Sequence, residues 1–202
     1  MKGSFDQEKA LRAWQRFVQM GELVPQVPAP IARSWLRCKN RGQLPVQFMP
    51  ARLPKTEPSP AGDPALMEAF RGTFRELEEY LAGDELLLVL LDPQGVLLDW
   101  QGNSRLLVSG ELEPGMCFDE ATVGTMAMSL ALEENNTVFV GGAQHYYSCY
   151  HRVASSAAPV LAAGRVAGIL GACTGVHQSS LGILAVLLGK KVLEARFPAG
   201  HA

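Results

Sequence analysis

The chain contains none of the short motifs that identify the common catalytic and nucleotide-binding sites. It has no GxxxxGK[ST] phosphate loop, no GxGxxG turn after a strand, no HExxH zinc motif and no GxSxG nucleophile turn. These absences argue against P-loop NTPases, Rossmann-type dehydrogenases, HExxH metalloproteases and α/β-hydrolases. We therefore expect a protein that has no catalytic activity of its own.

The chain also has little net charge. Its 202 residues carry a formal charge of −2, which creates no overall field to attract nucleic acid or anionic lipid. Basic residues are concentrated near the N-terminus, where we interpret them as a solvated helix face, with DNA contact by residues 31–41 as the alternative. These residues are Arg33, Arg37, Lys39, Arg41 and Arg52. We expect no direct nucleic-acid partner.

Long apolar runs and dense cysteine patterns are missing as well. Residues 1–14 lack the apolar stretch that is typical of a signal peptide. The longest apolar runs, LLLVLL and LGILAVLLG, are far shorter than a membrane span. The four cysteines show no CxxC spacing, which favours reduced thiols. We expect a soluble, cytoplasmic protein with no membrane partner.

Hydrophobic periodicity predicts helices and strands in a definite order. Helical spacing of apolar residues predicts helices at 5–20, 31–42, 64–83, 121–133 and 179–197. Short apolar runs predict strands at 85–91, 96–100, 137–142, 152–162 and 165–175. This order predicts an α+β fold with a mostly antiparallel central sheet of five to six strands, helices packed on one side and a pocket on the other.

The composition also predicts domain boundaries. Residues 1–42 are expected to form an N-terminal helical segment, and residues 43–64, with six prolines, an extended linker. Residues 65–197 are expected to form the main domain including the last helix, and residues 198–202 a tail. Asp63 is the expected N-cap of the helix that follows the linker.

One stretch has residues with the spacing of metal ligands. His145, Cys149 and His151 lie in QHYYSCYH, and a helical turn would bring His145 and Cys149 to one face, with Cys173 available as a fourth ligand. Such ligands would suit zinc or ferrous iron. Cys149 beside a histidine is also the best candidate for a reactive thiol, as in a reductase of a small oxidised metabolite. We favour a structural role for these residues and expect no cofactor.

A tyrosine-rich loop and nearby polar residues are candidates for a ligand pocket. Tyr146 and Tyr147 offer rings with hydroxyl tips, and Ser155 and Ser156 place two hydroxyls on an apolar strand. Loop anchoring and hydrogen bonds within the protein are the alternatives. We predict that a small molecule contacts Thr125, Met126, His145, Tyr146, Tyr147, Ser155 and Ser156. Asp119 and Glu120, by contrast, are explained by the dipole of the helix that follows them.

Several short segments follow one another in a recognisable order. IARSWLRC (residues 31–38) follows the pattern I-x-x-S-W-x-R-C, and DEATVGTMA (119–127) the pattern acid-acid-x-x-x-G-T-x-A. Trp14 and Phe17 match W-x-x-F, while the three later segments are VFVGGAQH (138–145), SSAAPV (155–160) and GILGACTG (168–175). Together they resemble the GAF sensor domain of acetoin- and glycerol-catabolism-type transcriptional activators, which depend on sigma-54. The resemblance covers residues 10–197.

The resemblance implies both a function and partners. A GAF-like fold with an N-terminal helical extension would enclose a small-molecule effector between the sheet and residues 119–151. The signal would pass to an ATPase and DNA-binding module, or to a partner protein, that these 202 residues do not contain. The last helix would pair across a homodimer, or else pack on its own sheet, through the stripe Leu181, Leu184, Leu188 and Val192.

At four positions the chain departs from the family pattern. Family members usually carry Asn at the position of Met126, Glu at that of Gln144, Cys at that of Ser156 and Asp at that of Gly171. The loss of polar or acidic groups at these positions implies an altered ligand preference or a vacant pocket.

Overall fold

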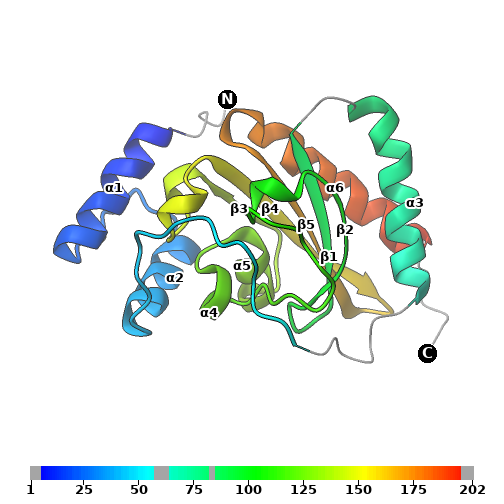
Figure 1. The fold of residues 1–202 in the computed structure, drawn as a ribbon, viewed down its shortest axis with the longest axis horizontal. Helices are drawn as coiled ribbons and strands as arrows, with labels where there is room; N and C mark the ends of the chain where they lie inside the picture. Colours follow the sequence, from blue (N-terminus) through cyan, green and yellow to red (C-terminus); the bar gives the residue numbers. More distant parts are fainter. Residues whose placement is uncertain (1–5, 57–63, 82–84, 197–202) are drawn as a thin grey trace.

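A five-stranded antiparallel sheet forms the centre of the molecule in the computed structural model, which describes residues 6–56, 64–81 and 85–196 (Figure 1). All neighbouring strands pair antiparallel. The predicted α+β fold with an antiparallel sheet is therefore confirmed. Across the sheet the strands are β2 (Leu97–Gly102), β1 (Leu86–Leu91), β5 (Arg165–Gly175), β4 (Val153–Ala162) and β3 (Val138–Gly141).

Helices flank this sheet at or near the predicted places. The α-helices are α1 (Gln7–Met20), α2 (Ala29–Asn40), α3 (Pro64–Leu81), α4 (Glu120–Val123), α5 (Ala127–Glu134) and α6 (Ser179–Arg196). Short 3-10 turns are η1 (Ser104–Leu106), η2 (Gly142–Gln144), η3 (Ser148–Tyr150) and η4 (Val176–Gln178). The predicted N-cap Asp63 and the tail at 198–202 lie outside the described residues. No helix in the described ranges is long and apolar enough to cross a bilayer.

The strand β1 explains why both faces of the sheet must be covered. All six of its residues are buried apolar side chains, so neither face can be left to water. Successive side chains alternate between faces: Leu87, Val89 and Leu91 join one core cluster, and the even-numbered leucines join the other. Each face therefore has its own hydrophobic core.

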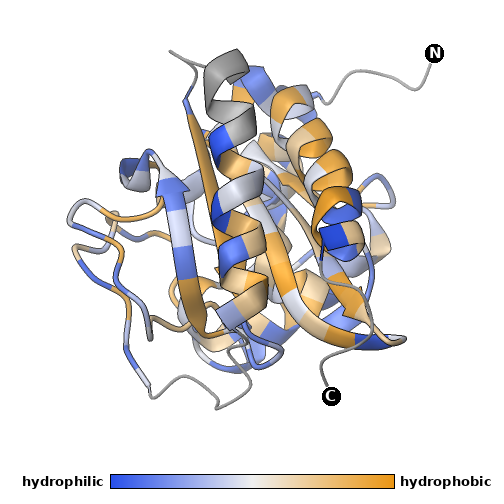
Figure 2. Cartoon of the chain, turned by 90° about the vertical axis from the view of Figure 1, so that its right-hand side faces the viewer, coloured by the Kyte–Doolittle hydropathy of each residue, from blue (hydrophilic) through white to orange (hydrophobic). Residues whose placement is uncertain are grey.

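Helices α3 and α6 cover one of these faces. Leu66, Phe70 and Phe74 of α3 are buried there, as their helical spacing predicted. Helix α6 approaches the sheet closely through its glycines, because an added Cβ at Gly189 would lie 3.0 Å from a methyl group of Leu170. Figure 2 shows the two helices side by side, with apolar residues along most of α6.

The opposite face is also covered by helices, which corrects our expectation of helices on one side and a pocket on the other. Helix α5 packs on β4 and β5, and α1 and α2 lie outside it against η2 and α4–α5 (Figure 1). Trp14, Phe17 and Trp35 from α1 and α2 are buried in the same core as β1. This face needs such a cover because its strand residues are apolar.

A second correction concerns the helix predicted at 121–133. The structure divides it into α4 and α5, because Gly124 adopts φ 64° and ψ −149°, a conformation that interrupts a helix. Met126 is extended, and its N–H bonds to the Ser129 hydroxyl, which caps α5. The apolar repeat continues across the break, so periodicity alone does not reveal it.

Gly171 shows how tightly α5 fills its face of the sheet. An added Cβ at Gly171 would lie 2.6 Å from Cγ of Met128 and 2.8 Å from a methyl group of Val89. The Met128 side chain thus occupies the space in front of position 171, where the family pattern given in the sequence analysis implies an aspartate. A side chain at position 171 and Met128 exclude one another.

This packing predicts a rescue. Gly171→Ala should destabilise the fold by about 1–3 kcal/mol through overpacking, and Met128→Ala by about 2–5 kcal/mol through loss of buried volume. In the double variant the two changes should partly compensate: the loss of unfolding free energy should be smaller than the sum of the two single losses by at least about 1 kcal/mol. Urea unfolding measures all three. Leu130→Ala is the control, since this buried α5 residue is not among the closest neighbours of Gly171. If Gly171→Ala combines with Met128→Ala as additively as it combines with Leu130→Ala, the proposed contact between Gly171 and Met128 is contradicted.

Candidate functional site

A buried carboxylate joins the N-terminal helices to the sheet domain. The side chain of Glu120, the first residue of α4, is 1% exposed. It accepts two hydrogen bonds from the Arg37 guanidinium at 2.7 Å, one from Arg41 at 3.0 Å and one from the Ser34 hydroxyl at 2.5 Å. The Ser34 oxygen lies 2.6 Å from the hydroxyl of Thr125. We call these five residues the Glu120 network.

The Glu120 network is held together by electrostatics. A carboxylate removed from water is costly unless cations and hydrogen bonds compensate it, and two guanidinium groups do so here. In return, the hydrogen bonds from Arg37 to Glu120 raise the pKa of that guanidinium above its ordinary value. If helix α2 moved away from α4, the Glu120 carboxylate would either become exposed to water or stay buried without its arginine partners.

Sequence reasoning missed this network. Asp119 does cap α4 as expected, accepting from the Thr122 N–H, but Glu120 does more than complement the helix dipole. The arginines of α2 and the linker are not simply a solvated face, because Arg33 and Arg52 also pair, with Glu134 and Glu113. A usable signal was present: Ser34 and Arg37 belong to one family pattern and Glu120 and Thr125 to another, and the two patterns meet here.

His145 is the centre of a second buried cluster. Its Nδ1 lies 2.9 Å from the Gly142 carbonyl and its Nε2 lies 2.9 Å from the Ser155 hydroxyl. The Ser155 oxygen also accepts the N–H of Ala127 at the start of α5. Burial lowers the pKa of His145 from 6.5 to about 3, so the ring is neutral. His145 thereby ties η2, β4 and α5 together.

The predicted ligand residues are buried and in contact with protein groups. The Tyr146 hydroxyl donates to the Gln43 carbonyl, and the ring of Tyr147 lies against Gly124. Ser156 faces the other side of the sheet from Ser155, close to Gly182 of α6. The structure therefore brings together all members of the predicted set except Ser156, each at most 5% exposed: Thr125, Met126, His145, Tyr146, Tyr147 and Ser155.

The thiols and histidines of the alternative metal site are also in structural environments. In the described part of the chain, no three His, Cys, Asp or Glu side chains gather as a metal site would require. The His151 ring packs edge-on against Trp14. Burial raises the pKa of Cys149 to about 11 and raises that of Cys173 as well. A thiol that stays protonated is a poor nucleophile and a poor metal ligand.

Comparison with known proteins identifies relatives of this arrangement. Residues 6–191 match a family model described as "MimR, N-terminal domain". The acetoin dehydrogenase operon transcriptional activator AcoR of Bacillus subtilis is 30% identical over 184 residues, which are 86% of this chain and 30% of AcoR. The propane 2-monooxygenase operon transcriptional activator MimR of Mycolicibacterium goodii is 29% identical over 158 residues, 75% of this chain and 26% of MimR. The chain thus spans less than a third of these relatives' length.

A solved structure has a similar fold. DhaR(N), in the DhaR(N)–DhaL complex of E. coli, superposes with a TM-score of 0.71 at 21% identity, over 83% of this chain and 60% of that one. At this identity the likeness concerns the fold alone. The resemblance to activator sensor domains that the motifs indicated is confirmed, and the fold is GAF-like.

The Glu120 network predicts a large stability effect. Glu120→Ala should lower the unfolding free energy by about 1–3 kcal/mol, because the buried Ser34 hydroxyl loses its acceptor, whereas the two guanidinium groups, 30% and 44% exposed, can bind water instead. Glu113→Ala is the matched control: it removes a carboxylate that pairs with Arg52 and Lys55 at the surface, where ion pairs contribute little, so a much smaller loss is expected. Chemical unfolding measures the loss of unfolding free energy in both variants. An equal loss would mean that the Glu120 charge is effectively solvated.

His145 predicts a pH dependence of stability. In the unfolded chain the imidazole titrates near 6.5, whereas in the folded protein its pKa is about 3. Between these values the unfolded state binds the additional proton, so stability is fully present above pH 6.5 and falls as the pH decreases. From about pH 7.5 to pH 5 this residue should cost about 2 kcal/mol.

Urea unfolding at both pH values measures the effect as a slope. His145→Gln should flatten the pH dependence, while His177→Gln, at an exposed histidine, should leave it unchanged. His151, whose pKa burial also lowers, contributes in the same direction and remains in both variants. If the slope of His145→Gln equals that of the unmodified chain, the buried neutral histidine is not its source.

Proposed function

Because the chain belongs to the family of MimR N-terminal domains, we propose that it is the cytoplasmic sensory domain of a transcriptional activator. It binds a small molecule and passes the signal through its terminal helices to an effector module. Its relatives are named as transcriptional activators of the acetoin dehydrogenase and propane 2-monooxygenase operons, which supports this assignment. The matched region is less than a third of those proteins, which leaves room in them for ATPase and DNA-binding modules. The protonated thiols favour sensing over catalysis.

The observation that carries the dimer part of the proposal is an apolar stripe on the outer side of α6. Leu184, Leu187 and Leu188 are 55%, 41% and 54% exposed, while the helix packs on the sheet through the opposite side, which includes Gly182 and Gly189. Two of the leucines that we expected in a dimer seam are thus turned away from their own sheet. A second copy of the chain is the proposed partner for this stripe, because two such helices can bury each other's leucines.

The residues predicted as ligand contacts have a different role in this proposal. Since Thr125, His145 and Ser155 are engaged by neighbouring protein groups, they hold η2 and the start of α5 in register with the sheet. They would transmit a displacement of the N-terminal helices to β4 and, through the sheet, to α6. Such a relay requires that the effector binds two arrangements of these elements with different affinity.

The stripe predicts the oligomeric state. The chain should be a dimer at micromolar concentration, and Leu184→Glu with Leu188→Glu should weaken dimerisation by about 100-fold or more, because burying each leucine contributes about 1.5–3 kcal/mol. Analytical ultracentrifugation measures the change. Leu44→Glu is the matched control at a leucine that is 71% exposed outside α6. A strictly monomeric parent chain, or equal weakening by the control, would contradict the α6 interface.

A further inference from the structure

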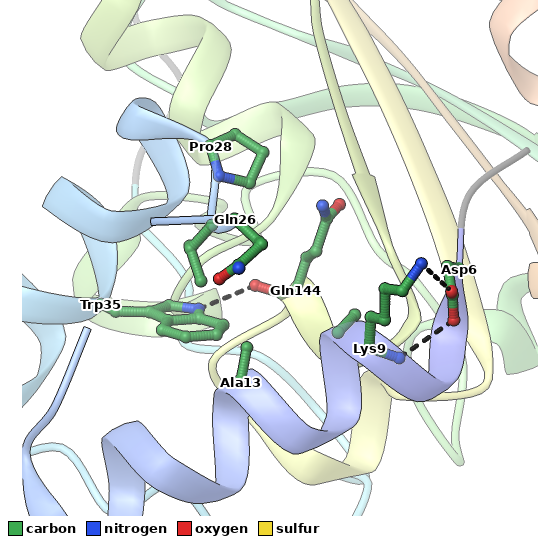
Figure 3. Close-up of a pocket in the computed structure, with 9 residues that line it drawn as sticks. Asp6, Lys9, Ala13, Gln26, Pro28, Trp35 and Gln144 are labelled. Atoms are coloured by element: carbon green, nitrogen blue, oxygen red, sulfur yellow. Dashed lines mark hydrogen bonds and ion pairs between the residues drawn. The ribbon is translucent and has the colours of Figure 1, made fainter. Parts of the chain in front are cut away.

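A cavity of about 180 Å³ lies between the N-terminal helices and η2, outside the tightly packed sheet face (Figure 3). One wall is α1, a second is the segment that leads into α2, and the floor is formed by Trp35. Gln144 at the end of η2 closes the remaining side. The lining residues are Asp6, Lys9, Ala10, Ala13, Gln26, Val27, Pro28, Trp35 and Gln144.

The walls of this cavity are largely apolar and are held in place. Ala13, Val27 and Pro28 line it around the ring of Trp35, and Figure 3 shows Gln26 above that ring and Ala13 below it. The Trp35 indole N–H donates to the Gln144 carbonyl at 2.8 Å, which fixes the orientation of the ring. An apolar part of a ligand would therefore meet a preformed surface.

The polar groups of the cavity define what else the ligand must carry. The Oε1 atom of Gln144 already accepts the Gly141 N–H at 3.0 Å, so this side chain can offer a ligand its Nε2 donors. Lys9 is paired with Asp6 at 2.9 Å, and the two charges cancel. Gln26 adds a neutral amide. The cavity therefore suits an uncharged molecule with a hydrogen-bond acceptor better than an anion or a cation.

We infer that this cavity is the effector site, and that it binds a compact, uncharged molecule with an apolar body and one acceptor oxygen. This inference rests on the proposed sensory function and gives it a location. The size follows from the volume, because a cavity of about 150 Å³ holds benzene, so about six to eight non-hydrogen atoms fit here. A neighbouring hollow of about 330 Å³ shares Lys9, Ala13 and Gln26 with the cavity.

The position of the cavity suits a sensor. Its walls come from α1, α2 and η2, so an occupant contacts all three elements at once. Gln144 directly precedes His145, whose ring bonds reach η2 and β4. The side chain at position 144 also determines the charge of the cavity. A carboxylate there would remove the donors and add a charge, so the amide sets the ligand class.

The test uses cyclohexanone, an uncharged probe with one acceptor oxygen, followed by ¹H–¹⁵N NMR of the indole N–H groups. The Trp35 signal should shift and saturate, while that of Trp100, which donates to the Leu112 carbonyl on another part of the molecule, should not. Methylenecyclohexane, which has the same shape without the oxygen, and cyclohexanecarboxylate, which is anionic, should each bind at least about tenfold more weakly.

Two substitutions complete the experiment. Ala10→Leu fills the cavity and should abolish the Trp35 shift, whereas Ala195→Leu, the same change at an exposed position of α6, should not; thermal melts check that both variants fold. Gln144→Glu keeps the acceptor for Gly141 but should weaken binding by about tenfold. Saturable shifts at other signals with Trp35 unmoved would overturn this site but leave small-molecule sensing intact. No shift of any signal with any probe would overturn the inferred site and ligand class, while dimerisation through α6 would stand independently.

Discussion

The buried charge of Glu120 is the constraint on which the arrangement of the other parts depends. A carboxylate that is removed from water must keep its compensating cations, and here those come from Arg37 on α2 and from Arg41 directly after it. With α2 fixed against α4, the indole N–H of Trp35 reaches the carbonyl of η2. The cavity beside that indole exists only while these helices stay docked.

The same docking explains why the sheet face is closed. Once α1, α2 and α5 cover it, the polar groups beneath must find partners within the protein, and His145 and Ser155 supply them for each other. Met128 fills the space before Gly171. A ligand is then more easily accommodated at the boundary between the helices and η2 than inside this core.

In the proposed sensor, strand alternation would place signal input and signal output on opposite faces of β4. Ser155 contacts His145 on the side of the N-terminal helices, and its neighbour Ser156 lies near Gly182 of α6. A displacement of β4 would therefore change the packing on both faces of the sheet at once, because close-packed interiors transmit displacement. The exposed leucines of α6 lie beyond the second face, where a dimer partner would read the change.

The sequence by itself determined the helices, the hairpin, the antiparallel sheet and the family, because these follow from local periodicity, turn residues and ordered motifs. It also marked residues 119–151 as the segment expected to enclose a ligand against the sheet. Only the tertiary structure decided that α4 and α5 separate at Gly124 and that Ser155 and Ser156 contact different helices. It also decided that Glu120 pairs with arginines about 80 positions away. Those outcomes depend on which distant groups share a low-dielectric interior, and a one-dimensional pattern does not contain that information.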